Sequence, residues 1–474
     1  MDTERRHRDA ENLLADNDQR QLLSFYEQLS ETQRADLLGQ IDQLDFKNIA
    51  VWVEKYVKNE YFAEIPSNFQ PAESYSPDPA PETADQYGDA HKLGGELLGS
   101  GKVAAFVVAG GQGTRLGFDG PKGNFPVSPI KNKTLFQIFA EIILAASKKY
   151  GASLPWYIMT SPLNHAATEA TFKENGYFGL NKDDIFIFQQ GTLPNFDFSG
   201  NILLSDKSTI AKSPDGHGGS LKALYQSGAV EDMKKRGIEY ISYFQVDNPL
   251  INIFSPLFIG FHASSGSEMS SRALVKSHAK EKVGNFCMVD GKMTVIEYSD
   301  LPDEYAEKTN SDGSLVFELG SIAIHMISRT FVEHLNSDGF ALPIHRAVKK
   351  IPFIDSDGNS VTPTEPNGVK LETFVFDALP LAEKSIILET IRSEEFAPVK
   401  NAQGDDSPQV TKQMMIERAA NWLESAGVDI PRKSDGSVDC VIEMAASFAL
   451  CPQDVKAKAD QVGKIEAGGE YYLQ

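Results

Sequence analysis

A glycine-rich stretch, VVAGGQGTRLGFDGPKG, starts at Val107 and directly follows an apolar, valine-rich run. The apolar run predicts a buried strand, because short apolar runs of this kind are typical of parallel sheets. Three glycines would let the backbone take positive φ and approach a ligand closely: Gly110, Gly111 and Gly113. Arg115 and Lys122 add cations that suit phosphate. The stretch therefore predicts a strand followed by a loop that holds an anion.

Two common phosphate motifs do not match this loop. A Walker A loop needs Gly-Lys followed by Ser or Thr, and the stretch has none. A dinucleotide-binding fingerprint needs a third glycine, but Leu116 stands there. It also needs a helix at once, which three prolines prevent: Pro121, Pro126 and Pro129. We expect the helix only from Thr134 or Leu135, so the long loop can wrap around a ligand.

The middle of the chain alternates strand and helix patterns, which predicts an α/β fold with a mostly parallel mixed sheet flanked by helices. Thr134 and Gln137 form a capping-box pattern, and Gly151 would end that helix. Asp290-Gly291 predicts a type I′ hairpin. Strands are expected in 102–109, 154–160, 184–190, 238–247, 314–327 and 368–379. Further helices are expected in 220–237 and 411–428.

The two ends differ from this central part. Residues 1–65 have helical patterns, with Asn17 or Asp18 as one cap and Ser30 as another. Residues 65–88 are rich in Pro, Ser and acidic residues and are typical of a linker. We therefore expect a helical N-terminal region, a catalytic domain and a small C-terminal α+β region: 1–95, 96–399 and 400–474.

Composition narrows the functional classes. The net charge of −21 argues against a nucleic-acid or anionic-membrane binder. No apolar run approaches the ~20 residues that cross a bilayer, and the charged N-terminus lacks the apolar core of a secretory signal. Three widely spaced cysteines form no metal or disulfide pattern. We expect a cytoplasmic protein, as a monomer or weak homodimer.

Further motifs accompany the glycine loop in a fixed order as far as about residue 402: TLFQI, YFGL, IFQQGTLP, SPDGHGG, VDNPL, VIEYSD, KKIPF, PNGVKLETFVFD and FAPVKNA. With AGGQGTRLG and PKG, they resemble the eukaryotic-type UDP-N-acetylglucosamine pyrophosphorylase family. These uridylyltransferases join UTP to a sugar 1-phosphate. The resemblance implies a GT-A-like nucleotide-binding domain between two smaller regions. It also implies UTP and N-acetylglucosamine 1-phosphate as substrates.

The resemblance also implies roles at the nucleotide. The uracil and ribose would contact Val108, Ala109, Gly110, Gly111, Gln190 and Gly216, and Asp247 would bind the nucleotide at its phosphates. Three cations would act on the phosphates as the catalytic residues: Arg115, Lys122 and Lys370. Asp247, at the end of a predicted strand, would ligate Mg²⁺ or Mn²⁺.

Other positions would bind the sugar 1-phosphate: Gly284, Glu297, Tyr298, Phe374 and Lys400. Two more depart from the family pattern. His217 and Ser321 stand where the family usually has asparagine, and both asparagines are expected to contact the sugar. These departures leave UDP-glucose or broad-range UDP-sugar pyrophosphorylase activity as an alternative.

The expected reaction needs no general base, because the sugar phosphate oxygen is already ionised. It attacks the α-phosphorus of UTP in line and pyrophosphate leaves, so catalysis rests on positioning and charge neutralisation. Two other classes stay open. A GT-A glycosyltransferase would normally show a DxD motif where this chain has Asp247-Asn248-Pro249. A non-catalytic UDP-sugar sensor would not need the loop cations.

Overall fold

The structure is a computed structural model and describes residues 3–59 and 68–474. The chain divides into two compact units that interleave along the sequence. The smaller contains 1–64, 191–219 and 342–375, and the larger contains 65–190, 220–341 and 376–474. The division into 1–95, 96–399 and 400–474 stays a prediction. Within the described residues, no helix is both long and apolar enough to cross a membrane.

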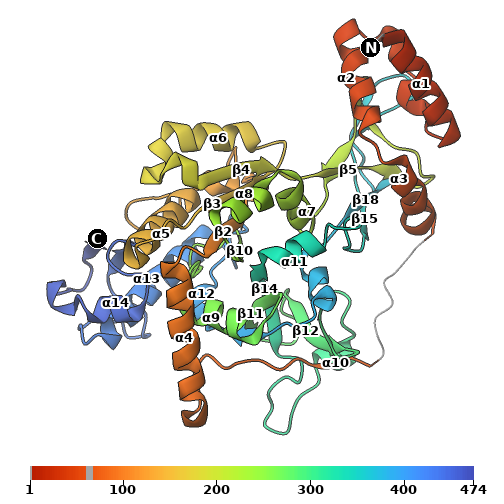
Figure 1. Ribbon diagram of the computed structural model, residues 1–474. Helices are drawn as coiled ribbons and strands as arrows, with labels where there is room; N and C mark the ends of the chain where they lie inside the picture. Colours follow the sequence, from red (N-terminus) through yellow and green to blue (C-terminus); the bar gives the residue numbers. More distant parts are fainter. Residues whose placement is uncertain (1–2, 60–67) are drawn as a thin grey trace. The chain divides into compact units, whose positions relative to one another are not determined.

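A mixed sheet forms the centre of the larger unit (Figure 1). Its parallel part has the order β10-β2-β3-β4. These strands are β2 (Val103–Val108), β3 (Trp156–Thr160), β4 (Ile185–Gln189) and β10 (Tyr240–Gln245). Every residue of β2 and β3 is buried. The sequence predicted all four, because continuous apolar runs are typical of strands covered on both faces.

The rest of this sheet is largely antiparallel and continues from β10 through β14. Asp290 and Gly291 have φ of 50° and 77°, which confirms the hairpin predicted between β12 and β13. The remaining strands are β1 (Gln70–Pro71), β11 (Met269–Val275), β12 (Gly284–Val289), β13 (Lys292–Ile296), β14 (Leu319–Ser328) and β19 (Ile387–Glu389). The predicted mixed α/β class is confirmed.

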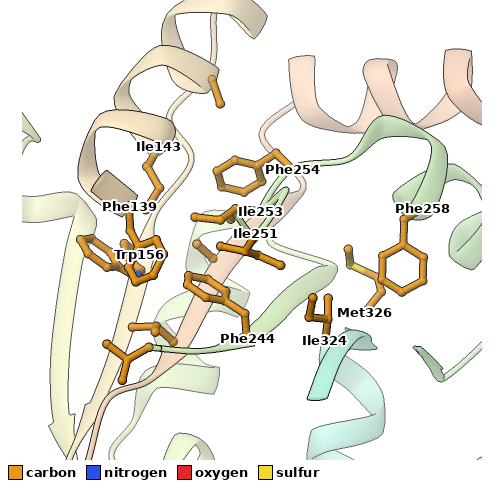
Figure 2. Packing of buried hydrophobic residues seen from close by; sticks show 14 of the residues in the cluster. Phe139, Ile143, Trp156, Phe244, Ile251, Ile253, Phe254, Phe258, Ile324 and Met326 are labelled. Carbon is orange, nitrogen blue, oxygen red and sulfur yellow. The ribbon is translucent and has the colours of Figure 1, made fainter. Parts of the chain in front are cut away.

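Helix α5 (Leu135–Tyr150) begins and ends where the sequence predicts. The Thr134 hydroxyl accepts from the Gln137 N–H at 3.2 Å, and Gly151 ends the helix with a φ of 68°. Gln137 completes no capping box, because its side chain donates to Glu141 instead. Figure 2 shows the core beneath α5, where the Phe139 ring meets the Phe244 ring edge-on at 5.1 Å. Each such buried aromatic contributes about 1.5–3 kcal/mol.

Helix α4 (Ala84–Gly99) was not predicted, because its first residues belong to the stretch interpreted as a linker. It packs against α9 (Pro256–Ser265) through glycines on both helices. A Cβ on Gly94 would collide with the Pro256 carbonyl, and one on Gly260 would collide with the Ala90 carbonyl. Close backbone contact thus stabilises a helix whose glycines weaken its intrinsic propensity.

The predicted helix 220–237 is wrong as a single element. It is two helices, α7 (Gly219–Gln226) and α8 (Ala229–Arg236), separated at Gly228, whose φ is 84°. That left-handed residue cannot continue an α-helix. The other helices of the larger unit are α6 (His165–Glu174), α10 (Asp303–Ala306), α11 (Arg329–His334), α12 (Arg392–Glu395), α13 (Pro408–Ser425) and α14 (Pro452–Lys456).

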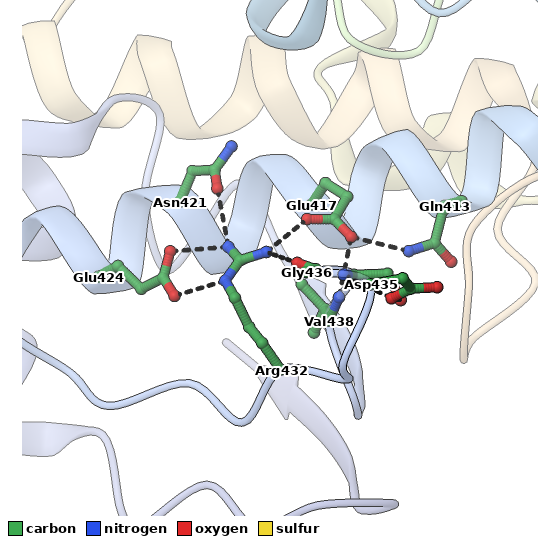
Figure 3. Close-up of polar contacts among 9 residues, drawn as sticks. Gln413, Glu417, Asn421, Glu424, Arg432, Asp435, Gly436 and Val438 are labelled. Atoms are coloured by element: carbon green, nitrogen blue, oxygen red, sulfur yellow. Dashed lines mark hydrogen bonds and ion pairs between the residues drawn. The ribbon is translucent and has the colours of Figure 1, made fainter.

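The last part of the larger unit has an apolar cluster of its own around Leu423, Ile442 and Val455. Its strands β20 (Val441–Met444) and β21 (Glu470–Leu473) pair in parallel. Arg432 fixes the segment that follows α13 (Figure 3). It makes two bonds with Glu424, at 2.8 and 2.7 Å, and further bonds with other side chains of α13 and with the Gly436 carbonyl. The predicted helix 411–428 is confirmed as α13.

The smaller unit combines N-terminal helices with short strands around one apolar cluster. Its helices are α1 (Thr3–Asp16), α2 (Glu31–Asp42) and α3 (Phe46–Trp52). The capping box at Ser30 is confirmed. The cap predicted at Asn17 or Asp18 is wrong: Asp18 has a φ of 53°, and two 3₁₀ turns follow it, Arg20–Leu23 and Tyr26–Gln28, neither with a cap at these residues. The predicted helical residues 60–65 lie outside the described residues. The strands are β5 (Thr192–Pro194), β6 (Phe196–Asp197), β7 (Leu204–Asp206), β8 (Thr209–Ile210), β9 (Lys212–Pro214), β15 (His345–Lys349), β16 (Phe353–Ile354), β17 (Ser360–Val361) and β18 (Gly368–Glu372).

Candidate functional site

The carboxyl ends of the parallel strands carry most of the predicted nucleotide-binding residues of the larger unit. The glycine loop follows β2, residues 161–164 follow β3, Gln190 follows β4, and Asp247 comes two residues after β10. Carboxyl ends of parallel strands meet at one edge of a sheet, and open α/β sheets bind ligands there. The topology therefore gathers these residues at one edge.

The glycine loop differs from its predicted conformation. Positive φ occurs at Gly117 and Gly120, with 68° and 132°, and not at the three glycines for which it was predicted: Gly110, Gly111 and Gly113. At two of these three positions, Gly110 and Gly113, the lack of room for a side chain explains why glycine is present. A Cβ on Gly110 would lie 3.0 Å from the Gln190 Oε1 atom, and one on Gly113 would lie 2.7 Å from the Phe118 ring. Gly110 and Gln190, both predicted at the uracil, are thus neighbours.

Asn164 holds this loop in place, and the sequence reasoning missed it. Its Nδ2 atom donates to the Ala109 and Gly111 carbonyls at 2.9 and 3.2 Å. Its Oδ1 atom accepts from the N–H and hydroxyl of Ser161. The side chain is 1% exposed. A polar residue shortly after a predicted strand was the available signal.

The loop keeps donors for a ligand. Among the described residues, no acceptor is found for the backbone N–H groups of Gly110 and Gly111. Arg115 is exposed, and within 3–59 and 68–474 its guanidinium forms no ion pair or hydrogen bond. Successive free N–H groups beside a free guanidinium can bind anionic oxygens or the edge of a base.

Lys122 and Asp247 lie together, as their predicted phosphate and metal roles require. The Lys122 Nζ atom is 3.4 Å from the Asp247 Oδ2 atom, and the two side chains are 16% and 18% exposed. The Asp247 carbonyl accepts from the Val399 N–H at 2.8 Å, which connects this strand end to the segment that carries Lys400. The pair therefore places a cation and a carboxylate side by side at this strand end.

Asp406 is a second carboxylate in this neighbourhood that the sequence reasoning missed, because it lies in a turn without a strand before it. Its Oδ2 atom is 3.8 Å from the Lys400 Nζ atom. Burial raises the pKa of Asp406; Lys400 opposes this shift, and the negative charge of Asp247 adds to it. Two carboxylates and two lysines therefore share the region: Lys122, Asp247, Lys400 and Asp406.

Three of the predicted sugar-binding residues also come together. Gly284 pairs with Ser321 across β12 and β14. A Cβ on Gly284 would lie 3.5 Å from the Glu297 Oε1 atom and 3.8 Å from the Ser321 Cβ atom. Tyr298, next along the chain, is 46% exposed. The Val295 Cγ1 atom would lie closer, at 2.5 Å, so packing also favours a glycine here. Carboxylate and hydroxyl side chains such as those of Glu297 and Ser321 can bind sugar hydroxyls.

Four predicted site residues belong to the smaller unit. His217 lies beside Phe374, with ring centroids 5.3 Å apart, and its Nδ1 atom accepts from the Val375 N–H at 3.1 Å. Burial lowers the pKa of His217 to about 4, so the ring is neutral at pH 7. Lys370 pairs with Glu372 at 2.9 Å. At Gly216, whose φ is 86°, a Cβ would collide with Thr373, so this glycine has a packing reason independent of any base.

Comparison with known proteins agrees with this geometry. The model of the family described as UTP–glucose-1-phosphate uridylyltransferase matches residues 77–465. The chain belongs to this family.

Its relatives carry sugar-nucleotide names. It is 38% identical to "UDP-N-acetylglucosamine pyrophosphorylase" of Saccharomyces cerevisiae, with 88% of this chain and 91% of the relative covered. It is 37% identical to "UDP-N-acetylhexosamine pyrophosphorylase-like protein 1" of Xenopus tropicalis, with 86% and 83% covered. A solved structure described as putative UDP-N-acetylglucosamine pyrophosphorylase from Entamoeba histolytica has a TM-score of 0.76 and 32% identity, covering 86% of this chain and all of that one. The predicted family and GT-A-like class are confirmed.

Proposed function

We propose that this chain is a uridylyltransferase that makes UDP-N-acetylglucosamine and pyrophosphate from UTP and N-acetylglucosamine 1-phosphate. Membership of the uridylyltransferase family supports the reaction type. The observation that carries the proposal is the Lys122–Asp247 pair beside a glycine loop with free N–H donors. This arrangement matches what phosphoryl and nucleotidyl transfer needs, which is charge placed around phosphate oxygens.

The residues divide the work between binding and charge neutralisation. The loop N–H groups and Gln190 hold the nucleoside end, and Arg115 and Lys122 bind the phosphates. Lys400 binds the phosphate of the sugar and directs its oxygen toward the α-phosphorus. The P–O bond to the new oxygen forms as the bond to pyrophosphate breaks, and no proton has to move. Positioning of this kind can contribute about 7–11 kcal/mol.

Asp247 fits a divalent ion only in part, as one ligand. No cluster of three or more metal-binding side chains occurs among residues 3–59 and 68–474. Mg²⁺ commonly takes one or two carboxylates and fills its other positions with substrate phosphates and water. Asp247 would thus hold Mg²⁺ or Mn²⁺ together with UTP. When bound, the ion supplies charge that offsets the phosphates.

The test is pyrophosphate release from UTP across a panel of sugar 1-phosphates, with and without Mg²⁺. We expect release with N-acetylglucosamine 1-phosphate and its loss on addition of EDTA. Lys122→Met should lower kcat/KM by about 10²-fold, as removal of one preorganised donor does. Lys92→Met, an exposed change on α4, should leave it unchanged. Absence of release with every sugar overturns the enzyme proposal and favours a UDP-sugar sensor.

The sugar is proposed from the printed names of the relatives and from the Gly284, Glu297 and Ser321 cluster. UDP-glucose or broad-range activity is the second candidate, favoured by Ser321, whose side chain is shorter than the asparagine usual in the family. Release with glucose 1-phosphate alone would overturn the sugar assignment and leave the reaction type intact. A cytoplasmic location is also proposed, because all three cysteines are free.

A further inference from the structure

A partly open cavity of about 280 Å³ lies in the larger unit, lined by residues outside the glycine loop. Its walls come from α5, α12, α13 and β20, and from residues 249–252. Apolar side chains such as Ile142, Ile251 and Trp422 form much of its lining. The cavity lies near the small end of the range of ligand pockets, about 300–1,000 Å³. It can enclose one small molecule.

Glu443, on β20, gives this cavity a polar group that lacks a hydrogen bond. The side chain is 4% exposed. Its Oε2 atom accepts from the Ser128 hydroxyl at 3.0 Å and from the N–H groups of Ile130 and Lys131 at 2.7 Å each. Its Oε1 atom is buried and accepts no hydrogen bond from the described residues, and the nearest ammonium, on Lys133, is 3.8 Å away. A buried carboxylate oxygen without a hydrogen bond is destabilising, so a donor is expected there.

The charged residues around the cavity indicate which kind of hydrogen-bond donor a bound molecule would bring. Five carboxylates line it: Glu141, Glu389, Glu394, Glu395 and Glu443. Three cations line it as well: Lys133, Arg272 and Arg418. Both arginines are engaged, since Arg272 pairs with Glu395 at 3.2 Å and Arg418 donates to the Leu250 and Glu394 carbonyls. Glu141, Glu394 and Glu395 have partners as well, in Lys133, Trp422 and Arg272. The carboxylates still outnumber the cations by five to three, which disfavours an anionic ligand and favours an amine.

The cavity adjoins the segment that follows Asp247. Asn248 donates to the Glu395 carbonyl at 2.7 Å, and its Oδ1 atom accepts from the Ala397 N–H at 3.0 Å. The Glu395 carboxylate accepts from the Asn252 N–H at 3.3 Å. Glu443 in turn holds residues 128–131, which follow the glycine loop. A molecule in the cavity would therefore contact segments that follow Lys122 and Asp247 closely along the chain.

We propose that this cavity is a binding site for a small apolar amine. Its ammonium group donates to the Glu443 Oε1 atom once that side chain turns toward the cavity, because the atom is covered as the side chain now lies. The occupant orders residues 248–252 and thereby acts on Asp247 from outside the nucleotide site. The binding claim stands on the cavity alone. Its effect on turnover rests on the proposed function.

The test is calorimetric titration of the full chain, without substrates, with three probes of similar size: 2-phenylethylamine, 2-phenylethanol and 3-phenylpropionate. We expect the amine to bind about 10-fold or more tightly than the other two, because only the amine can make a charge-assisted hydrogen bond to the carboxylate. Glu443→Gln should remove this preference and leave binding of the alcohol unchanged. Hydrogen exchange of residues 248–252 should slow when the amine binds.

A second variant keeps the test valid if Glu443→Gln folds poorly. Ala419→Met on α13 should fill the cavity and weaken all three probes, whereas Gln409→Met, exposed on the same helix, should not. Lack of binding by every probe, or amine binding that neither Glu443→Gln nor Ala419→Met weakens, overturns the proposal. Loss of amine binding would leave the uridylyltransferase proposal untouched, because pyrophosphate release is measured separately.

Discussion

His262 is a single buried residue whose protonation state the structure determines. The ring is fully buried; its Nε2 atom lies 3.0 Å from the Ser328 hydroxyl and its Nδ1 atom lies 2.7 Å from the Ser270 hydroxyl. Ser328 donates to the Ser267 carbonyl, so its oxygen accepts from Nε2–H, and Nδ1 accepts from Ser270. Burial lowers the pKa of His262 to about 3.

Because this folded pKa lies below the unfolded value of about 6.5, protonation favours the unfolded chain. The stability that His262 contributes is present above pH 6.5 and declines as the pH falls toward 3. Between pH 7 and pH 5 the wild type should lose about 2 kcal/mol relative to His262→Gln. Thermal melts of both proteins at the two pH values measure this. An equal change of stability with pH in the wild type and in His262→Gln would contradict the assignment. The control is His91→Gln, an exposed change that should keep the pH dependence of the wild type.

Single residues also show what the sequence could and could not predict. The structure brings residues predicted for one site together in pairs, Gly110 with Gln190 and Lys122 with Asp247. Their roles stay a prediction. The backbone angles were mispredicted, because glycine tolerates both signs of φ, and only the surrounding atoms decide which is used. Asp406 was missed, because its role depends on charges distant in sequence.

Asn164, which directly precedes helix α6, fixes the glycine loop. Asn164→Ala removes both donors to the Ala109 and Gly111 carbonyls, so the loop N–H groups should lose their alignment. We expect KM for UTP to rise about 10–100-fold, with a smaller change in kcat. Steady-state kinetics with UTP varied measure this. Asn175→Ala, an exposed change at the other end of α6, should leave KM unchanged; a purely structural role of Asn164 would lower the Tm without this rise in KM.

The segment after α13 depends on Arg432 (Figure 3). Arg432→Met removes the two-bond pair with Glu424 and leaves the Gly436 carbonyl without this donor. We expect about 1–2 kcal/mol of lost local stability, more than an ordinary surface pair gives, because the geometry is bidentate. Hydrogen exchange of residues 430–440 should quicken accordingly. Lys464→Met, which breaks a highly exposed pair with Glu466, is the control.

Elements were predictable where local pattern and packing agree, as in α5 and β2. They were not predictable where packing overrides the local pattern. Helix α4 carries glycines that lower its propensity, and only contact with α9 explains them. The split between α7 and α8 depends on the left-handed Gly228, which resembles any other helical glycine in sequence.

The whole molecule shows a division that no local pattern reveals. Residues 191–219 and 342–375 join the N-terminal helices in one unit, although the larger unit separates them in sequence. Local composition marks linkers, whereas these units are defined by contacts between distant segments. Alternating strand and helix patterns predicted the α/β class, and the resemblance to known uridylyltransferases added the GT-A-like layout.

The net charge of −21 leads to a prediction for the whole molecule. UTP is a polyanion, and two nearby cations are already paired, Lys122 with Asp247 and Lys400 with Asp406. Of the cations Arg115, Lys122 and Lys400, only Arg115 forms no ion pair among the described residues. The surplus of acidic groups therefore dominates the electrostatic potential that UTP meets at longer range. Raising the ionic strength from 10 to 150 mM shortens the Debye length from about 30 to 8 Å and screens this repulsion. We therefore expect kcat/KM for UTP, at saturating Mg²⁺, to rise about 2–5-fold, opposite to the effect of salt on an enzyme with attractive steering. A fall in kcat/KM would show instead that local cations control the approach of UTP.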